Sequence, residues 1–325
     1  MNVRQIQAFL AIVNYGGIRA AGRAIHLSPS AITRAVSQLE EELQCVLLIR
    51  GNNGSGELTE EGKAFYPYAA SIVDELAQAQ DAIAQMHGGD TGSVRFAVSP
   101  FLPSDVLTKA LHLFRSRFHK VRLEIRDGLY GHCMPAMQAG ALDFAVTLIT
   151  DNLVWPNDNF SVKRLFSVRQ GLIANRSHPI HQSQNPLDVS RYEWIITADS
   201  LENAANRIGE TFVKKGLAWP VNIIVCDLYQ HDQLLRNPES QVIGVAPYSL
   251  QVLMEEDRRL LKQVDFGDHP LASMLKLPNL IGAYVARSNV PLTPAAQYFA
   301  DCLLFAIETW RKANPAIFAD AVDHS

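Results

Sequence analysis

The 325-residue chain has few of the features that disulfide frameworks, zinc clusters and membrane spans require. Its four cysteines, at positions 45, 133, 226 and 302, are far apart and form no Cys-x-x-Cys pair, so neither a disulfide framework nor a zinc cluster is expected. No apolar run is long enough to cross a bilayer, and no basic stretch followed by an apolar one opens the chain. These absences argue against a membrane protein or an exported one, and we expect a cytoplasmic location.

Motifs that would hold a metal or carry out catalysis are also missing. His178 and His181 have the spacing of two metal ligands on a helix, but Pro179 interrupts a regular helix and no acid or cysteine joins them, which favours surface histidines. No Gly-x-Ser-x-Gly elbow is present, and no motif pairs a nucleophile with a base. We therefore expect no metal, no cofactor and no enzymatic activity.

What the sequence does contain is the pattern of two short helices joined by a tight turn in residues 18–50. Small residues on one face of the first helix, from Ile18 to Ile25, would let a second helix approach closely. Ser28 is a candidate N-cap for that second helix, and Pro29 suits its first position. Apolar residues then recur at intervals of four, three and four: Ile32, Val36, Leu39 and Leu43. The opposite, polar face is typical of a helix-turn-helix that enters the major groove.

At this point the chain resembles the LysR-type transcriptional regulators. Segments that match the family's winged helix-turn-helix are Ala20-Ala21, Leu27-Ser28, Leu39 to Leu43, Leu47 to Arg50 and Leu58 to Gly62. Pro291 to Ala296 resembles the start of the family's last helix, and Ala139 to Asp143 resembles its Ala-Gly-x-Leu-Asp turn. The resemblance spans roughly residues 1 to 310.

The resemblance implies an α/β fold with an N-terminal winged helix-turn-helix, a long linker helix and a C-terminal two-lobed effector domain like that of periplasmic binding proteins. The implied divisions are residues 1–58 for the winged helix-turn-helix, 59–87 for the linker (dimerisation) helix, 88–91 for a hinge, 92–312 for the effector domain and 313–325 for a tail without an assigned role. Lobe I would combine about 92–160 with 270–310, and lobe II would comprise about 161–269, with a ligand cleft between them.

Three features depart from the family's pattern. Residues 1–87 carry six basic residues against nine acids, although up to Arg50 the balance is five to three in favour of arginine; such a small footprint suffices when several heads bind DNA together. Pro29 stands where the family usually has glutamine, and it cannot donate to a base. The wing, Gly51 to Gly56, is polar where the family commonly has further basic residues. Its glycine spacing also fits a phosphate cradle, but such a cradle needs a preceding strand and a following helix within one nucleotide-binding unit, so a hairpin tip is favoured.

The candidate DNA-contacting residues share a polar side chain and a place in the second helix, its cap or the wing. They are Ser28, Ser30, Thr33, Arg34, Ser37, Gln38, Arg50, Asn52 and Asn53. Among them, Ser30, Thr33 and Arg34 are the residues onto which the family's groove contacts carry over most directly. The alternative is that all of them form only a solvated surface.

A long helix is predicted from Thr59 to His87, with Thr59 as its N-cap and acids in its first turn. Its apolar residues alternate at spacings of four and three: Phe65, Ala69, Ile72, Leu76, Ala79, Ile83 and Met86. Such a seam needs a partner, and the resemblance implies that it packs against its equivalent in a second subunit. We therefore expect a homodimer and, from two dimers, a homotetramer. A helix that lies on its own domain is the alternative.

Beyond Gly88 to Gly92, strand and helix patterns alternate, which predicts parallel sheets with helices on both faces. Ligands of open α/β sheets bind beyond the carboxyl ends of the strands. The residues expected there are Ser99, Phe101, Leu102, Gly128, Tyr130 and Thr147, facing Thr197, Asn203, Asp227 and Pro247. Few of them carry charge, so we expect a small organic acid, with an aromatic acid as one option, held by neutral donors. A helix cap or a turn is an equally good reading of each single residue.

The favoured hypothesis is a sequence-specific DNA-binding regulator. Its expected partners are double-stranded operator DNA, a small-molecule effector, further copies of the chain and RNA polymerase, with no membrane. An α/β enzyme fused to a winged helix is the alternative, but it would need a nucleophile or a cofactor lysine that no motif supplies. A transport receptor would need a leader peptide, which Met1 to Gln5 does not begin.

Overall fold

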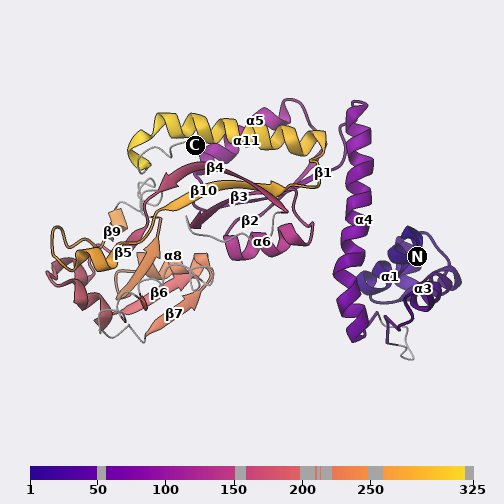
Figure 1. Cartoon of the computed structure of the whole chain (residues 1–325), viewed down its shortest axis with the longest axis horizontal. Coiled ribbons are helices and arrows are strands. Elements are labelled where there is room, and N and C mark those ends of the chain that lie inside the picture. Colours follow the sequence, from indigo (N-terminus) through magenta and orange to yellow (C-terminus); the bar gives the residue numbers. More distant parts are fainter. Residues whose placement is uncertain are drawn as a thin grey trace.

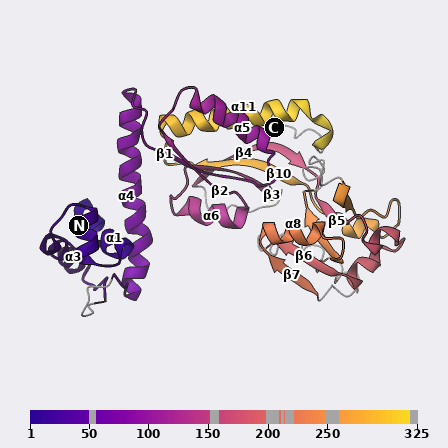
Figure 2. The same ribbon diagram turned by 180° about the vertical axis from the view of Figure 1, so that it is seen from behind.

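A computed structural model of the chain describes residues 1–49, 56–150, 159–197, 209–210, 213, 222–247 and 259–318. A helical head at the N-terminus and a two-lobed α/β domain are joined by one long helix, α4 (Glu60–Met86) (Figure 1). Seen from behind, the head lies against one end of α4, and lobe I lies beside its other end (Figure 2). This is the architecture predicted from the sequence.

The head packs three helices around one apolar core. The helices are α1 (Val3–Tyr15), α2 (Ile18–Ala24) and α3 (Pro29–Leu43). Phe9 and Leu39 are fully buried at the centre of this core. α3 begins at Pro29 as predicted, because the Ser28 hydroxyl accepts a hydrogen bond from the Ala31 N–H (3.2 Å) and so satisfies one of the free donors at the helix start.

A buried carboxylate ties α3 to the strand that leads into the wing. Glu40 accepts hydrogen bonds from the backbone N–H groups of Leu47 (2.8 Å) and Leu48 (3.2 Å). Leu48 then pairs with Leu58 in an antiparallel bridge at the base of the wing. The segment that leads toward the wing is therefore held to α3 by a side chain of α3 itself.

The first turns of α4 belong to the head. The Thr59 hydroxyl accepts from the Gly62 N–H (3.0 Å), which makes Thr59 the N-cap that the sequence predicts. Ala69 is fully buried in the head core, and the ring of Phe65 lies 5.6 Å from that of Phe9. The N-terminal part of α4 is thus held by the same apolar packing that holds the head together.

Lobe I is a five-stranded sheet in the order β2-β1-β3-β10-β4. Its strands are β1 (Ser93–Val98), β2 (Arg122–Asp127), β3 (Phe144–Thr150), β4 (Phe160–Val168) and β10 (Leu280–Arg287). One face is covered by α5 (Ser104–Arg115) and α11 (Pro294–Ala313), and the other by α6 (Tyr130–Gln138) (Figure 1). Aromatic rings fill the space under α11, where the ring centroids of Phe96 and Phe299 are 4.6 Å apart.

Lobe II is a second five-stranded sheet, in the order β7-β6-β8-β5-β9. Its strands are β5 (Gly171–Asn175), β6 (Glu193–Thr197), β7 (Ile223–Cys226), β8 (Val242–Ala246) and β9 (Leu261–Gln263). Its fully described helical elements are α8 (Leu228–Arg236) and the 3₁₀ turns η1 (Pro179–Gln182), η2 (Pro186–Arg191) and η5 (Ala272–Leu275). Trp194 is fully buried, and its indole N–H donates to the Val189 carbonyl (2.9 Å), so this core holds its largest side chain with its polar atom satisfied.

The sheets differ from the sequence expectation in two ways. Each sheet is mixed rather than parallel, because β10 runs antiparallel to β3 and β4, and β5 runs antiparallel to β8 and β9. β4 lies in the first sheet, so that lobe I includes residues up to Val168 and does not end near residue 160. Both differences have one cause. The chain leaves lobe I after β4 and returns through β10, and a strand that returns from the other lobe enters the sheet from the opposite end.

Part of the C-terminal tail packs on lobe I. After η6 (Pro315–Ile317), Phe318 forms an antiparallel bridge with Val168 at the end of β4. Its ring centroid lies 5.1 Å from that of Trp310 and 5.5 Å from that of Phe166. These contacts give the first residues of the tail a structural role that the sequence did not indicate.

The described residues contain neither a helix long and apolar enough to cross a membrane nor a group of side chains arranged to bind a metal ion. His178 is buried and His181 is half-buried, whereas the sequence had suggested that both histidines lie on the surface. His178 is 3% exposed, its Nδ1 accepts from the Ile180 N–H (3.0 Å), and its ring lies 4.5 Å from that of Tyr192. It caps η1 because Pro179 starts that turn.

Burial of His231 in α8 predicts that acid destabilises the protein. The side chain is 1% exposed, and burial lowers its pKa from 6.5 to about 4. In the unfolded chain His231 takes up a proton below about pH 6.5, whereas in the folded protein it does so only near pH 4. The contribution of the neutral, buried His231 to the free energy of unfolding is therefore complete above about pH 6.5 and is lost as the pH falls toward 4. We expect a loss of about 2 kcal/mol in the free energy of unfolding at about pH 5.

Urea unfolding near pH 7.5 and near pH 5 measures this loss, with His231→Leu as the comparison. The pKa of His178 is also lowered by burial, and its contribution is common to both proteins. The fall in stability should be about 2 kcal/mol smaller in the variant. An equal fall in both proteins would contradict the assignment to His231.

Candidate functional site

The polar face of α3 is open to solvent. All six candidate residues in the described part of this region are exposed: Ser28, Ser30, Thr33, Arg34, Ser37 and Gln38. The hydroxyls of Ser28 and Ser30 are 3.1 Å apart, and the Thr33 hydroxyl donates to the Pro29 carbonyl (2.9 Å). The other three predicted DNA contacts, Arg50, Asn52 and Asn53, lie outside the described residues.

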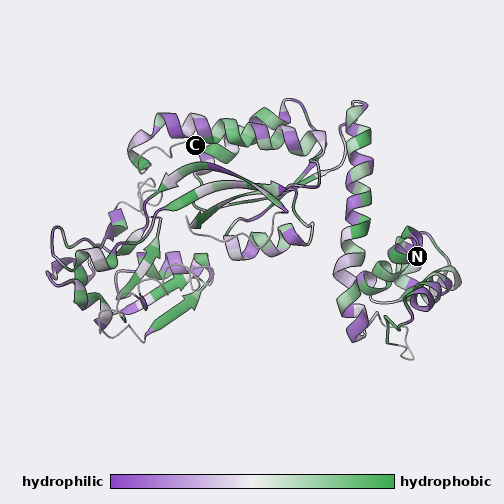
Figure 3. Cartoon of the chain, in the orientation of Figure 1, coloured by the Kyte–Doolittle hydropathy of each residue, from purple (hydrophilic) through white to green (hydrophobic). Residues whose placement is uncertain are grey.

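The candidate dimerisation seam divides into two parts. Phe65 and Ala69 pack into the head of their own chain, so the expectation that they face a partner is wrong for these two. The remaining positions are exposed along one side of α4: Ile72, Leu76, Ala79, Ile83 and Met86. Figure 3 shows apolar residues along the part of α4 that extends beyond the head. We name these five residues the α4 seam.

A cavity lies between the two lobes, beyond the carboxyl ends of several strands. Seven of the residues expected there line it: Ser99, Phe101, Gly128, Tyr130, Thr147, Thr197 and Pro247. The cavity has a volume of about 80 Å³, several times the roughly 10–15 Å³ that one water molecule needs. The described lining contains hydroxyl and amide groups and apolar side chains, and no carboxylate, imidazole, ammonium, guanidinium or thiol.

The backbone at the end of β1 shapes the lobe I side of the cavity. The Ser99 N–H donates to the Val146 carbonyl (2.7 Å), and the Ser99 hydroxyl accepts from the Phe101 N–H (3.4 Å). A Cβ atom at Gly128 would lie 2.3 Å from the Val98 carbonyl carbon, so only glycine permits this close approach of the chain after β2. Ser99 is 5% exposed, which leaves its hydroxyl close to the cavity but hardly accessible to bulk solvent.

Thr147 is the unusual member of the lining. Its side chain, on β3, is fully buried, and its hydroxyl has no hydrogen-bond partner in the protein. A buried hydroxyl without a partner costs about 1–3 kcal/mol. A hydroxyl of this kind beside a cavity is suited to bind a group that enters the cavity.

Two expected cavity residues lie elsewhere, and a third cannot be placed. Leu102 packs against the core of lobe I, and Asp227 is the exposed N-cap of α8, where it accepts from the Gln230 N–H (2.9 Å). Asn203 is outside the described residues. The sequence analysis missed eight lining residues: Leu129, Leu148, Ile149, Thr150, Gln170, Val245, Ala246 and Leu280. Gln170 and Leu280 belong to the two crossovers between the lobes, whose positions no local pattern revealed.

Comparison with protein families accounts for both parts of the molecule. The profile described as "Bacterial regulatory helix-turn-helix protein, lysR family" matches residues 3–63, and the "LysR substrate binding domain" matches residues 87–305. The chain belongs to the LysR family. The second match alone covers more than half of the chain. The residues between the two matches, 64–86, all belong to α4.

Individual relatives within this family are distant. The LysR-family chain is 29% identical over 147 residues to the nitrogen assimilation regulatory protein nac of Klebsiella aerogenes, which is 45% of this chain and 48% of that protein. It is 24% identical over 195 residues to the transcriptional activator AaeR of Escherichia coli, which is 59% of this chain and 60% of that protein. The chain thus matches only about half to three fifths of the length of these relatives.

Solved structures share the fold over nearly the whole chain. The structure of full-length CbnR with its target DNA has a TM-score of 0.61 at 18% identity and covers 94% of this chain and 100% of that one. LysG from Corynebacterium glutamicum, with bound effector arginine, has a TM-score of 0.58 at 18% identity and covers 94% of this chain and 98% of its own. At this identity the likeness concerns the fold alone.

The partnerless hydroxyl predicts that Thr147→Val stabilises the ligand-free protein. Valine keeps the shape of threonine and removes the unpaired polar group, so the free energy of unfolding should rise by about 1 kcal/mol. Urea unfolding measures it. Thr293→Val is the matched control, because the buried Thr293 hydroxyl accepts from the Ala296 N–H (3.2 Å) and its loss should destabilise the protein. Destabilisation by both substitutions would show that the Thr147 hydroxyl is paired in solution.

Proposed function

We propose that this chain is a DNA-binding transcriptional regulator controlled by a small molecule that binds between lobes I and II. The observation that carries the proposal is the match of one chain to both halves of the LysR family, with an exposed polar face on α3 and a cavity between the lobes. A regulator of this kind acts where the DNA is, which supports a cytoplasmic location.

The α3 face supports recognition of double-stranded DNA. Its hydroxyls, one amide and one guanidinium are the groups that read base edges or hold phosphates in the major groove. Arg34 is the one basic residue of α3, so a single head has little electrostatic affinity for DNA. Binding therefore depends on two or more heads that engage one operator together.

The α4 seam supports a homodimer. Ile72 and Leu76 are 39% and 38% exposed, and Ile83 and Met86 are 58% and 70% exposed, which is unfavourable unless another apolar surface covers them. The spacing of the seam suits a second copy of α4. A tetramer built from two such dimers, and contact with RNA polymerase, extend this proposal to larger assemblies.

The cavity lining favours a small organic acid as the ligand. Hydroxyl and amide groups of Ser99, Thr147 and Thr197 would hold a carboxylate without a charged partner, and the rings of Phe101 and Tyr130 would contact an apolar or aromatic body. The alternative, an α/β enzyme fused to a winged helix, would need an acid, a base or a nucleophile at the cavity. The described lining offers no such ionisable side chain beyond the Tyr130 phenol.

Arg34→Ala tests the proposed DNA face. We expect operator affinity to fall by about 1–3 kcal/mol per head, because a base-edge or phosphate contact is lost while the fold is unchanged. A gel-shift titration of the protein's own promoter region at fixed salt measures it. Arg122→Ala, an exposed arginine of β2 in lobe I, is the matched control and should bind as the unmodified protein does. Equal binding by both variants would remove α3 from the interface.

Leu76→Arg tests the α4 seam. An unpaired charge in an apolar helix interface costs several kcal/mol, so the dimer should dissociate and operator affinity should fall with it. Analytical ultracentrifugation measures the assembly state. Ala77→Arg is the control, because this exposed residue of α4 lies outside the seam. An intact Leu76→Arg dimer would show that the seam faces something other than a second α4.

A further inference from the structure

The first crossover between the lobes is very short. β4 ends at Val168 and β5 begins at Gly171, so Arg169 and Gln170 alone carry the chain from lobe I into lobe II. Gln170 also lines the cavity between the lobes. Its Cα atom can lie at most about 7 Å from that of Val168, because only two residue steps separate them. The position of Val168 therefore limits the position of a cavity residue.

Val168 has a partner on each side. On one side it pairs with Leu280, the first residue of β10, which also lines the cavity. On the other side it forms an antiparallel bridge with Phe318 of the C-terminal tail. β4 is the last strand in the order of its sheet, so the tail supplies an outer partner at the point where the chain leaves lobe I.

Three aromatic rings anchor the tail at this bridge. They belong to Phe318, to Trp310 of α11 and to Phe166 of β4. Their centroids are 5.1, 5.5 and 6.3 Å apart, and their planes meet at 82°, 61° and 74°. Such edge-to-face contacts are a favoured geometry for aromatic pairs. Phe166 is 3% exposed, so the tail is joined to the core of lobe I and not only to its surface.

A glycine on β10 makes room for this cluster of rings. Gly282 lies opposite Phe166 in the sheet, and a Cβ atom there would lie 2.3 Å from Cζ of the Phe166 ring. Any larger residue would push the ring away. The position of the ring therefore depends on the backbone of β10 as well as on the tail.

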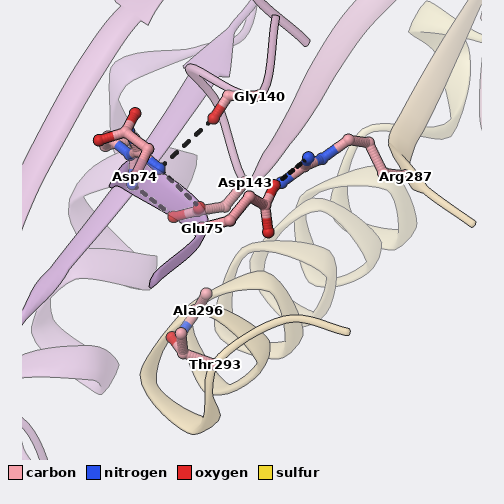
Figure 4. Close-up of polar contacts among 8 residues, drawn as sticks. Asp74, Glu75, Gly140, Asp143, Arg287, Thr293 and Ala296 are labelled. Carbon is pink, nitrogen blue, oxygen red and sulfur yellow. Dashed lines mark hydrogen bonds and ion pairs between the residues drawn. The ribbon is translucent and has the colours of Figure 1, made fainter. Parts of the chain in front are cut away.

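α11 supports the tail from the other direction. The helix begins at the Thr293 cap, where the hydroxyl accepts from the Ala296 N–H (3.2 Å) (Figure 4). At its far end the Asn314 side-chain amide donates to the Trp310 carbonyl (2.9 Å) and closes the last turn. The single turn of η6 then brings Phe318 to the end of β4.

A hydrogen bond ties the second crossover to the first. Nε2 of Gln170 donates to the carbonyl of Pro278 (2.8 Å), which lies two residues before β10. Both connections between the lobes are thus joined to each other close to the point where Phe318 meets Val168.

We propose that residues 314–318, which we name the C-terminal clasp, hold the crossovers to lobe I, and that Phe318 acts through Val168 as a positioning residue for Gln170. In the part of the lining that the structure describes, the clasp contributes no residue, so it acts from outside the cavity. Its part in a ligand response rests on the proposed function. Its hold on the crossovers does not.

Trypsin digestion of the full chain tests the clasp, because the exposed Arg169 places a cleavage site within the first crossover. Cleavage requires local opening of the chain, so its rate follows the population of the open crossover. Phe318→Ala removes two of the three ring contacts. We expect it to raise the rate of cleavage after Arg169 about tenfold, as measured by mass spectrometry of the new chain ends.

Phe305→Ala is the matched control, because it removes the same ring from an exposed position on α11 and should leave the rate unchanged. Phe318→Leu keeps a large apolar side chain at the bridge and should restore most of the protection. Cleavage after Arg122, in β2, reports whether lobe I is folded and should stay slow in all these proteins.

Gly282→Ala tests the clasp from the side of β10. The added methyl group displaces the Phe166 ring, so cleavage after Arg169 should again become faster while β2 stays resistant. This second variant decides the matter if Phe318→Ala does not fold.

Equal rates after Arg169 in Phe318→Ala and Phe305→Ala would overturn the proposal. An equal rise after Arg122 would overturn it too, because lobe I as a whole would then be unfolding. So would a Gly282→Ala protein that is cut after Arg169 no faster than the unmodified chain. None of these measurements involves DNA or a ligand, so they fail only if the clasp fails and not if the proposed function does.

Discussion

The unbroken backbone of α4 is the constraint on which the rest of the molecule depends. One helix supplies Ala69 to the core of the head, Asp74 and Gln85 to the contact with lobe I, and Leu76 to the exposed seam. Because an α-helix is stiff over this length, the direction of the head relative to lobe I follows from the packing at the two ends of α4.

The cavity between the lobes meets a different physical requirement. Its lining brings Ser99 and Thr147 from lobe I together with Thr197 from lobe II, so a ligand that contacts all three favours one arrangement of the lobes. The unpaired Thr147 hydroxyl makes the empty state less stable than it would otherwise be. Binding energy of this kind can shift the balance between arrangements, since only contacts that differ between two states affect their populations.

Electrostatics in the head favour cooperation between copies over strong binding by one. The acids of the first 87 residues outnumber the basic residues, and Arg34 alone carries positive charge on α3. A protein with so small a basic footprint gains little affinity from counterion release per head. The proposed dimer through the α4 seam and the weak single head are therefore consistent with each other, because joined heads raise the effective concentration of each for its half-site.

Local patterns in the sequence were sufficient to predict α3 from its Ser28 cap and apolar spacing, α4 from its Thr59 cap, and the cavity residues that directly follow predicted strands, such as Ser99 and Gly128. These features depend on contacts between residues close in the chain. Tertiary structure alone decided that Ala69 faces the head and not a partner, that β10 runs antiparallel to β3 and β4, that Gln170 reaches the cavity, and that Gln85 and Arg287 hold α4. Each of these depends on pairs of residues that are distant in sequence, and no periodicity within one segment contains the information that brings such pairs together.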